Sequence, residues 1–107
     1  MFTQKTVIAL LKKFASEVND SGIHLKKIVL YGSYAKNKQS EWSDIDVAMV
    51  ADEFSGIGFK DISLFAKIQI QHPYYLIQPC TYNTNEFSTA KDPFVKEILR
   101  TGIEINY

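Results

Sequence analysis

The sequence has little cysteine and no excess of charge, and each shortage excludes a class of protein. It has one cysteine, Cys80, so an intrachain disulfide is impossible and nothing requires an oxidising compartment. Its 12 basic and 12 acidic side chains balance, so there is no overall positive field to attract nucleic acid. No apolar run approaches the ~18 residues of a membrane span, and the N-terminus lacks the basic-then-apolar signal pattern. We therefore expect a cytoplasmic protein.

Length and composition are those of an ordinary globular chain. With 107 residues, 46% of them hydrophobic and 13% aromatic, the sequence can form one core but not two, so we expect a single domain over 1–107. Repeats, low-complexity tracts and linkers are absent from the sequence. Charge is unevenly distributed: residues 1–40 hold seven Lys and two acids, whereas residues 41–65 hold one Lys and six acids.

Hydrophobic periodicity predicts helices alternating with strands. An apolar stripe predicts an amphipathic helix from Thr3 to about Asn19. Apolar runs predict strands at 26–31, 44–50 and 74–82, and a short final edge segment at 103–107. Further helices are predicted at 33–38, at 59–71 with Ile62, Phe65 and Ile68 inward, and from Asp92-Pro93 to a stop at Gly102. This order predicts an α/β (α+β) domain with a small mixed β-sheet and helices mainly on one face.

Two carboxylates lie at the start of the second predicted strand. Side chains two apart in a strand point the same way, roughly 6.5 Å apart along the chain, so Asp44 and Asp46 face one side and Ile45 and Val47 the other. Adjacent carboxylates repel each other unless a cation lies between them. Magnesium suits such a pair because it binds one or two carboxylates and takes its other ligands from water and phosphate. An N-cap or a charge pair at a strand edge is the structural alternative.

A Gly-Ser turn follows the first predicted strand. Gly32 allows the backbone to approach a phosphate closely, and exposed N–H groups with the Ser33 hydroxyl can hold its oxygens. An ordinary strand-to-helix turn with Ser33 as N-cap is the alternative. Together with the carboxylate pair, the turn indicates a nucleoside triphosphate bound with magnesium.

Gly32-Ser33 followed by Asp44-Ile45-Asp46 resembles the signature of the polymerase-beta-type nucleotidyltransferases. The short chain is similar to the minimal nucleotidyltransferase (MNT) branch, whose members pair with HEPN-domain proteins. The resemblance extends from the first helix to Gly102–Ile105. It implies the nucleotidyltransferase fold, a triphosphate contact at Gly32 and Ser33, and Mg²⁺ held by Asp44 and Asp46.

The chain departs from the family pattern at two positions. Lys36 lies where family members often carry a basic residue that can touch phosphate, but Asn37 replaces the usual glycine. Active members place a third carboxylate on the third strand, and here that position holds Gln78. Glutamine can ligate magnesium weakly but cannot accept a proton. Glu86 is the nearest acid downstream that could substitute.

The resemblance implies transfer of a nucleotidyl group, AMP from ATP, to a partner protein. A plausible role is the antitoxin of a HEPN–MNT toxin–antitoxin pair. The alternative is a weak or inactive module of the same fold that neutralises or regulates a partner by association, which Gln78 favours. The oligomeric state stays open. Cys80 and Trp42 are expected to be packing residues rather than reactive groups.

Overall fold

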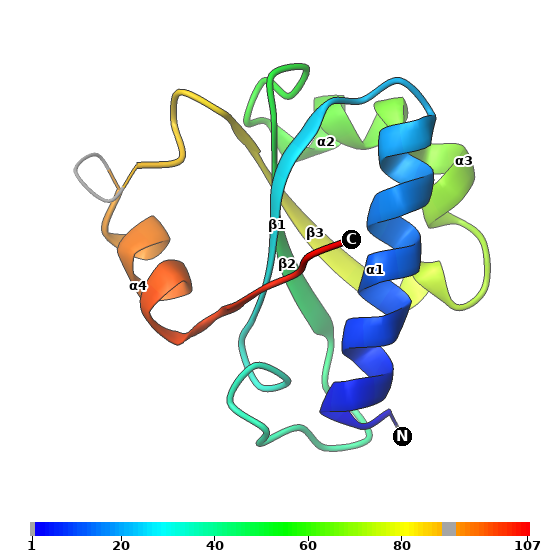
Figure 1. Ribbon diagram of the computed structural model, residues 1–107, viewed down its shortest axis with the longest axis vertical. Coiled ribbons are helices and arrows are strands. Elements are labelled where there is room, and N and C mark those ends of the chain that lie inside the picture. The colour runs from blue at the N-terminus through cyan, green and yellow to red at the C-terminus, as the bar shows by residue number, and fades with distance from the viewer. Residues whose placement is uncertain (1, 89–91) are drawn as a thin grey trace.

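The computed structural model describes residues 2–88 and 92–107, in which a four-stranded sheet lies between helices (Figure 1). The longest helix is α1 and a shorter one, α4, lies near the C-terminus. In chain order the elements are α1 Gln4–Asp20, β1 Leu25–Tyr31, β2 Ile45–Ala51, α2 Gly58–Asp61, the 3₁₀ turn η1 Ile62–Leu64, α3 Ala66–Gln69, the 3₁₀ turn η2 Tyr74–Leu76, β3 Ile77–Asn83, α4 Pro93–Thr101 and β4 Ile103–Glu104.

The sheet is mixed, with strand order β3-β2-β1-β4. β1 is antiparallel to both of its neighbours, β2 and β4, whereas β2 and β3 are parallel. The predicted final edge segment is confirmed as β4, which pairs Ile103 with Leu30. The C-terminal end of β1 therefore lies at the same end of the sheet as the N-terminal ends of β2 and β3. The residues that lie at this end are Gly32, Asp44, Asp46 and Gln78.

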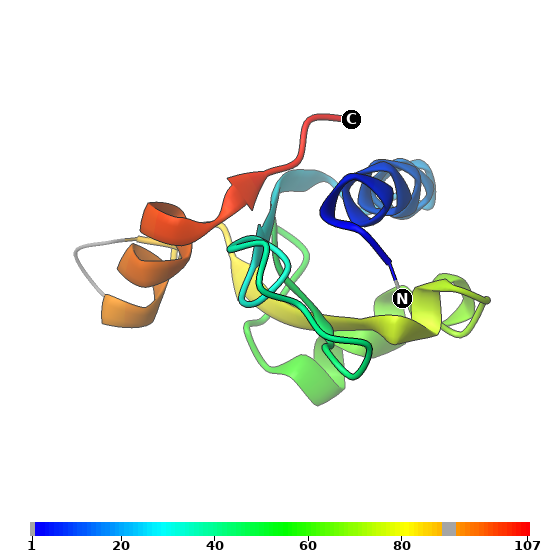
Figure 2. The ribbon, with the colours of Figure 1, turned by 90° about the horizontal axis from the view of Figure 1, so that it is seen from below.

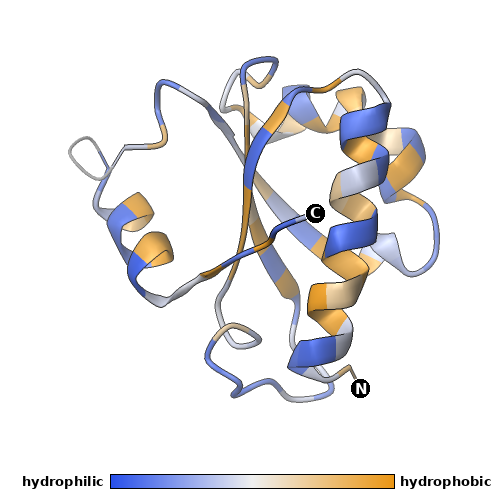
Figure 3. Ribbon diagram, viewed as in Figure 1, coloured by the Kyte–Doolittle hydropathy of each residue, from blue (hydrophilic) through white to orange (hydrophobic). Residues whose placement is uncertain are grey.

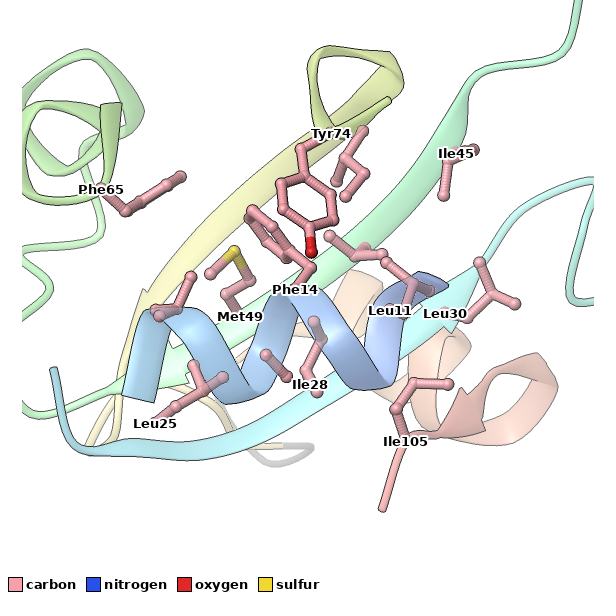
Figure 4. Packing of buried hydrophobic residues seen from close by; sticks show 14 of the residues in the cluster. Leu11, Phe14, Leu25, Ile28, Leu30, Ile45, Met49, Phe65, Tyr74 and Ile105 are labelled. Atoms are coloured by element: carbon pink, nitrogen blue, oxygen red, sulfur yellow. The ribbon is translucent and has the colours of Figure 1, made fainter. Parts of the chain in front are cut away.

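The main core lies between α1 and one face of the sheet (Figure 4). The helix stripe that includes Leu11 and Phe14 is fully buried, as is Met49 from β2. Figure 3 shows the same stripe as hydrophobic patches along a helix that is otherwise polar. Phe14 also packs against the ring of Phe65, 6.4 Å away between centroids. Burial of these large apolar side chains stabilises the fold by about 1.5–3 kcal/mol each.

A smaller apolar cluster lies on the opposite face, under α4. Val95 and Ile98 of this helix pack with Ala48 and Val50 of β2. Figure 2 shows α1 and α4 well apart, with strands between them. Among the described residues, most helices contribute to the first face and α4 covers part of the second, so the predicted α/β class with a mixed sheet is confirmed. Within the described residues, no helix is long and apolar enough to cross a membrane.

Helix ends signalled by local chemistry were predicted well. The predicted first helix is confirmed, and the Thr3 side chain accepts a hydrogen bond from the backbone N–H of Thr6. α4 begins as predicted, with Asp92 as N-cap accepting from the N–H of Phe94 and with Pro93 at the first helical position.

Three predicted elements were wrong in part. Residues 33–38 form hydrogen-bonded turns instead of a short helix, so no helix dipole is available there. The predicted helix over 59–71 is broken into α2, η1 and α3, and Ile62 is exposed rather than inward. The predicted strand 74–82 begins only at Ile77, because the preceding residues form η2.

A buried carboxylate accompanies the break in the helix. Asp61, only 2% exposed, accepts hydrogen bonds from the backbone N–H groups of Ser55 and Gly56 and from the hydroxyls of Ser55 and Thr81. These bonds fix the end of α2 to the preceding loop and to β3. Tertiary hydrogen bonds of this kind override a continuous helical pattern.

Candidate active site

Asp44 and Asp46 lie at the start of β2 with the alternation that the sequence predicts. Asp44 directly precedes the strand and is exposed, and Asp46 is its second residue and is half-buried. Ile45 and Val47, between and after them, are buried in the main core on the other face. The two carboxylates therefore lie at one end of the sheet, on the face that α4 partly covers.

The two carboxylates influence each other's ionisation. Burial raises the pKa of Asp46, and the negative charge of Asp44 raises it further. Like charges held this close disfavour the ionised form unless a cation compensates them. The pair thus has the electrostatics of a cation site.

Gly32 forms a sharp turn directly against Asp46. Its φ is +75°, a conformation that favours glycine. A Cβ at Gly32 would lie 2.6 Å from Oδ2 of Asp46, so a side chain there would force the carboxylate to move. The predicted phosphate turn and the predicted metal ligand therefore lie in direct contact.

The turn after Gly32 folds back on itself. The N–H of Lys36 donates to the carbonyl of Gly32 at 3.2 Å, and the N–H of Lys38 donates to that of Ser33 at 2.9 Å. Asn37 adopts a positive φ of 56°, as expected for the residue that replaces the family's glycine. The Gln4 side chain donates to the carbonyl of Tyr34 at 2.9 Å and so fastens the turn to α1.

The remaining predicted residues lie around this centre. Gln78 is the Cα partner of Asp46 across the parallel pair β2–β3 and is exposed, so its amide is beside the carboxylate pair. Ser33 is half-exposed and Lys36 exposed. Hydrogen bonds from Arg100 lower the pKa of Glu97 on α4, and the positive charges of Arg100 and Lys36 add to this effect.

Glu86 was the wrong candidate for the missing acid. It follows the far end of β3, and its carboxylate lies against Gly56, where a Cβ would be 2.8 Å from Oε2. Gln78 is at the near end of the same strand. At 3.3 Å per residue it lies about 16 Å from Asn83, the last residue of the strand before Glu86. Glu86 therefore cannot act on a group held by Asp46.

The donor set suits magnesium shared with a substrate. The described residues contain no group of three or more His, Cys, Asp or Glu that could enclose a metal ion. A pair of carboxylates beside an amide oxygen fits an ion that keeps water and phosphate among its ligands. Asp44 and Asp46 would hold such an ion, with Gln78 as a neutral neighbour.

Two aromatic residues differ from expectation or were missed. Trp42, predicted to pack, is 86% exposed in the loop before Asp44. Tyr31, not singled out from the sequence, is the Cα partner of Asp46 across β1–β2. Burial, then Cys80 and Asp46, raise the pKa of Tyr31 to about 12. Its place directly before Gly32 was the signal that could have revealed it.

A cavity of about 180 Å³ lies beside the same end of the sheet. Its lining includes Tyr34, Ser43 and Ile45, so it lies on the core side of β2 and not over the carboxylates. A second cavity of about 330 Å³ between α1 and η2 is lined by Leu10, Tyr74 and their neighbours, away from this site. Neither of these two cavities is lined by Asp44 or Asp46.

Comparison with known proteins agrees with this geometry. A family model described as "Polymerase beta, Nucleotidyltransferase" matches residues 11–106. The chain is 26% identical over 102 residues, which is 92% of this chain and 98% of the relative, to a "Putative protein adenylyltransferase" of Methanocaldococcus jannaschii. A solved "putative nucleotidyltransferase" from Sulfolobus solfataricus has the same fold, with a TM-score of 0.65, 18% identity, and coverage of 94% of this chain and 80% of that one.

Proposed function

Because the chain belongs to the polymerase-beta-type nucleotidyltransferase family, we propose that it binds a magnesium–nucleoside triphosphate and transfers the nucleotidyl group to a partner protein. ATP is the expected donor, so the group transferred is AMP. The observation that carries the proposal is the contact between the Gly32 turn and the Asp46 carboxylate, because it joins a phosphate-binding turn to a metal-binding pair.

Each residue has a defined role in this proposal. Gly32 and Ser33 hold phosphate oxygens through backbone N–H groups and the hydroxyl, and Lys36 adds positive charge. Asp44 and Asp46 would hold Mg²⁺, and the ion would supply positive charge against the charge that develops on the phosphates. An acceptor oxygen forms a bond to the α-phosphorus while the bond to the β-phosphate oxygen breaks, and pyrophosphate leaves. Gln78 cannot accept the acceptor's proton, so the proton passes to solvent.

The acceptor is proposed to be a protein. The relative from Methanocaldococcus jannaschii bears the name of a protein adenylyltransferase, which agrees with a protein acceptor. A HEPN-type helical protein is the proposed partner, with this chain as the antitoxin that inactivates it by adding AMP.

One observation favours a second function. Gln78 occupies the position beside Asp46 where a third acid would assist proton removal. A chain with this substitution could retain nucleotide binding and regulate its partner by association alone. The intact carboxylate pair favours the enzymatic function over this alternative.

Transfer of radiolabel from α-phosphate-labelled ATP into lysate of the source cells tests the proposal. The Asp44→Asn, Asp46→Asn double variant is the control. A labelled protein band with the wild type alone supports nucleotidyl transfer and identifies the acceptor. Absence of the band, with Mg-ATP binding retained, supports the binding function instead.

A further inference from the structure

An aromatic pair lies on the same face of the sheet as the carboxylates. Tyr31 is the Cα partner of Asp46, and Asp46 is the partner of Gln78, so the three side chains form one row across the sheet. Phe94, in the first turn of α4, meets Tyr31 edge to face, with ring centroids 5.7 Å apart and an angle of 89° between the rings. Phe94 therefore lies next to the Tyr31 end of the row that Gln78, Asp46 and Tyr31 form.

The side of α4 that carries Phe94 faces the phosphate turn. Residues three apart in a helix share a side, so Phe94 and Glu97 are neighbours along α4. Phe94 contacts the ring of Tyr31, the residue directly before Gly32, so this side of α4 lies close to the turn. α4 thus forms a wall beside the surface where a triphosphate would lie.

The packing of α4 does not require Phe94. The helix buries Val95 and Ile98 against the sheet, whereas Phe94 is 48% exposed. Its contact with Tyr31 fixes the ring while leaving much of its surface open to solvent. A fixed, accessible aromatic ring is a surface on which a nucleobase can stack.

We propose that Phe94, supported by Tyr31, is the stacking surface for the base of the bound nucleoside triphosphate. This inference rests on the proposed function. Only a ribose separates the base from the α-phosphate, so the base must lie just beyond the carboxylates. Phe94 contacts the ring of Tyr31, and Tyr31 is itself beside Asp46.

Stacking on Phe94 favours a ligand that carries a base over one that does not, but it does not select one base over another. Every base has a face that can stack, whereas reading its edge needs free donors or acceptors. Both carboxylate oxygens of Glu97 accept hydrogen bonds from Arg100, at 2.7 and 3.1 Å. The carboxylate of Glu97, one helical turn from Phe94, is thus already hydrogen-bonded to Arg100. Stacking on Phe94 alone therefore does not distinguish ATP from GTP.

Calorimetric titration with Mg-ATP and with magnesium tripolyphosphate tests the inference. The wild type binds ATP roughly tenfold more tightly than tripolyphosphate, the size expected for one stacking contact. Phe94→Leu keeps an apolar contact with Tyr31 but removes the aromatic face, so it abolishes that difference and leaves tripolyphosphate affinity unchanged. Phe94→Trp retains the difference. Leu99→Ala, at another exposed apolar residue of α4, is the matched control.

The outcomes distinguish a failure of this inference from a failure of the proposed function. If the wild type binds neither ligand, the proposed function and the inference both fail. If it binds both but Phe94→Leu has wild-type ATP affinity, only the inference fails. A loss of ATP affinity in Trp42→Leu with none in Phe94→Leu would place the base on the loop before Asp44 and would equally overturn it.

Discussion

Gly32 and Asp46 are in such close contact that a side chain at position 32 would displace the Asp46 carboxylate. A Cβ there would lie 2.6 Å from Oδ2 of Asp46, and the φ of +75° already disfavours a side chain. The turn and the carboxylate come from different strands, 14 positions apart in the sequence. Their contact makes the geometry of one dependent on the other, and so each supports a testable prediction.

Gly32→Ala should disrupt both folding and binding. The left-handed conformation alone costs about 1–2 kcal/mol for alanine, and the collision displaces Asp46 as well. Gly22→Ala is the matched control, because Gly22 has a φ of +106° but nothing within 4 Å of the added Cβ. We expect both variants to lose stability in urea unfolding and only Gly32→Ala to lose Mg-ATP affinity. Equal affinities would contradict a role for the close contact.

Asp46→Asn should stabilise the metal-free protein slightly while removing its response to magnesium. Burial and Asp44 raise the pKa of Asp46, so the protonated form is favoured in the folded state. The stabilisation that comes from protonating Asp46 is complete below its pKa in the unfolded chain and is lost as pH rises through its pKa in the folded protein. At neutral pH the ionised carboxylate therefore destabilises the fold. Screening limits the gain to about 1 kcal/mol. Thermal unfolding with and without Mg-ATP measures both effects.

Asp52→Asn is the control for that comparison, because Asp52 is an exposed acid at the far end of β2. It should leave the melting temperature and the response to Mg-ATP close to wild type. A wild-type melting temperature that Mg-ATP does not change would argue against a metal–nucleotide site at Asp46.

Asp61→Ala should destabilise the fold by about 2–3 kcal/mol, because it leaves several donors without their acceptor. Burial alone would raise the pKa of Asp61, but hydrogen bonds from Ser55, Thr81 and Gly56 outweigh it and lower the pKa. The stabilisation is therefore present above the unfolded pKa and is lost as pH falls through the folded pKa.

Urea unfolding at neutral and acidic pH measures this effect. The difference between wild type and Asp61→Ala should shrink in acid. A difference that is independent of pH would mean that the carboxylate charge contributes nothing. Thr81→Val, which removes one donor of the set, should cost less than Asp61→Ala.

Gln78→Asp should accelerate transfer. It places a carboxylate in the row beside Asp46, where it can accept the acceptor's proton, an effect worth about 100-fold or more in favourable cases. The initial rate of label transfer from ATP measures it. Gln71→Asp, at an exposed glutamine beside the second cavity, adds the same charge elsewhere and should leave the rate unchanged. No acceleration in Gln78→Asp would favour regulation by association.

Local chemistry along the chain determined a large part of this protein. Alternation in an apolar strand was sufficient to put Asp44 and Asp46 opposite the buried Ile45. Capping residues were sufficient for the start of α4, since Asp92 and Pro93 act on the backbone within one turn. Both signals operate over a few residues, which is why they can be read without a fold.

Only the tertiary structure decided features that depend on distant contacts. The helix predicted over 59–71 is broken where Asp61 bonds to Ser55 and Thr81, and that pairing requires β3 to lie beside the loop. Strand register likewise put Tyr31 beside Asp46. Gln78 lies on the other side of Asp46, as the family resemblance implies, and β3 ends before Glu86 at the opposite end of the sheet. Register depends on which strands pair and on the match between their apolar faces, so the pattern of one strand alone does not specify it.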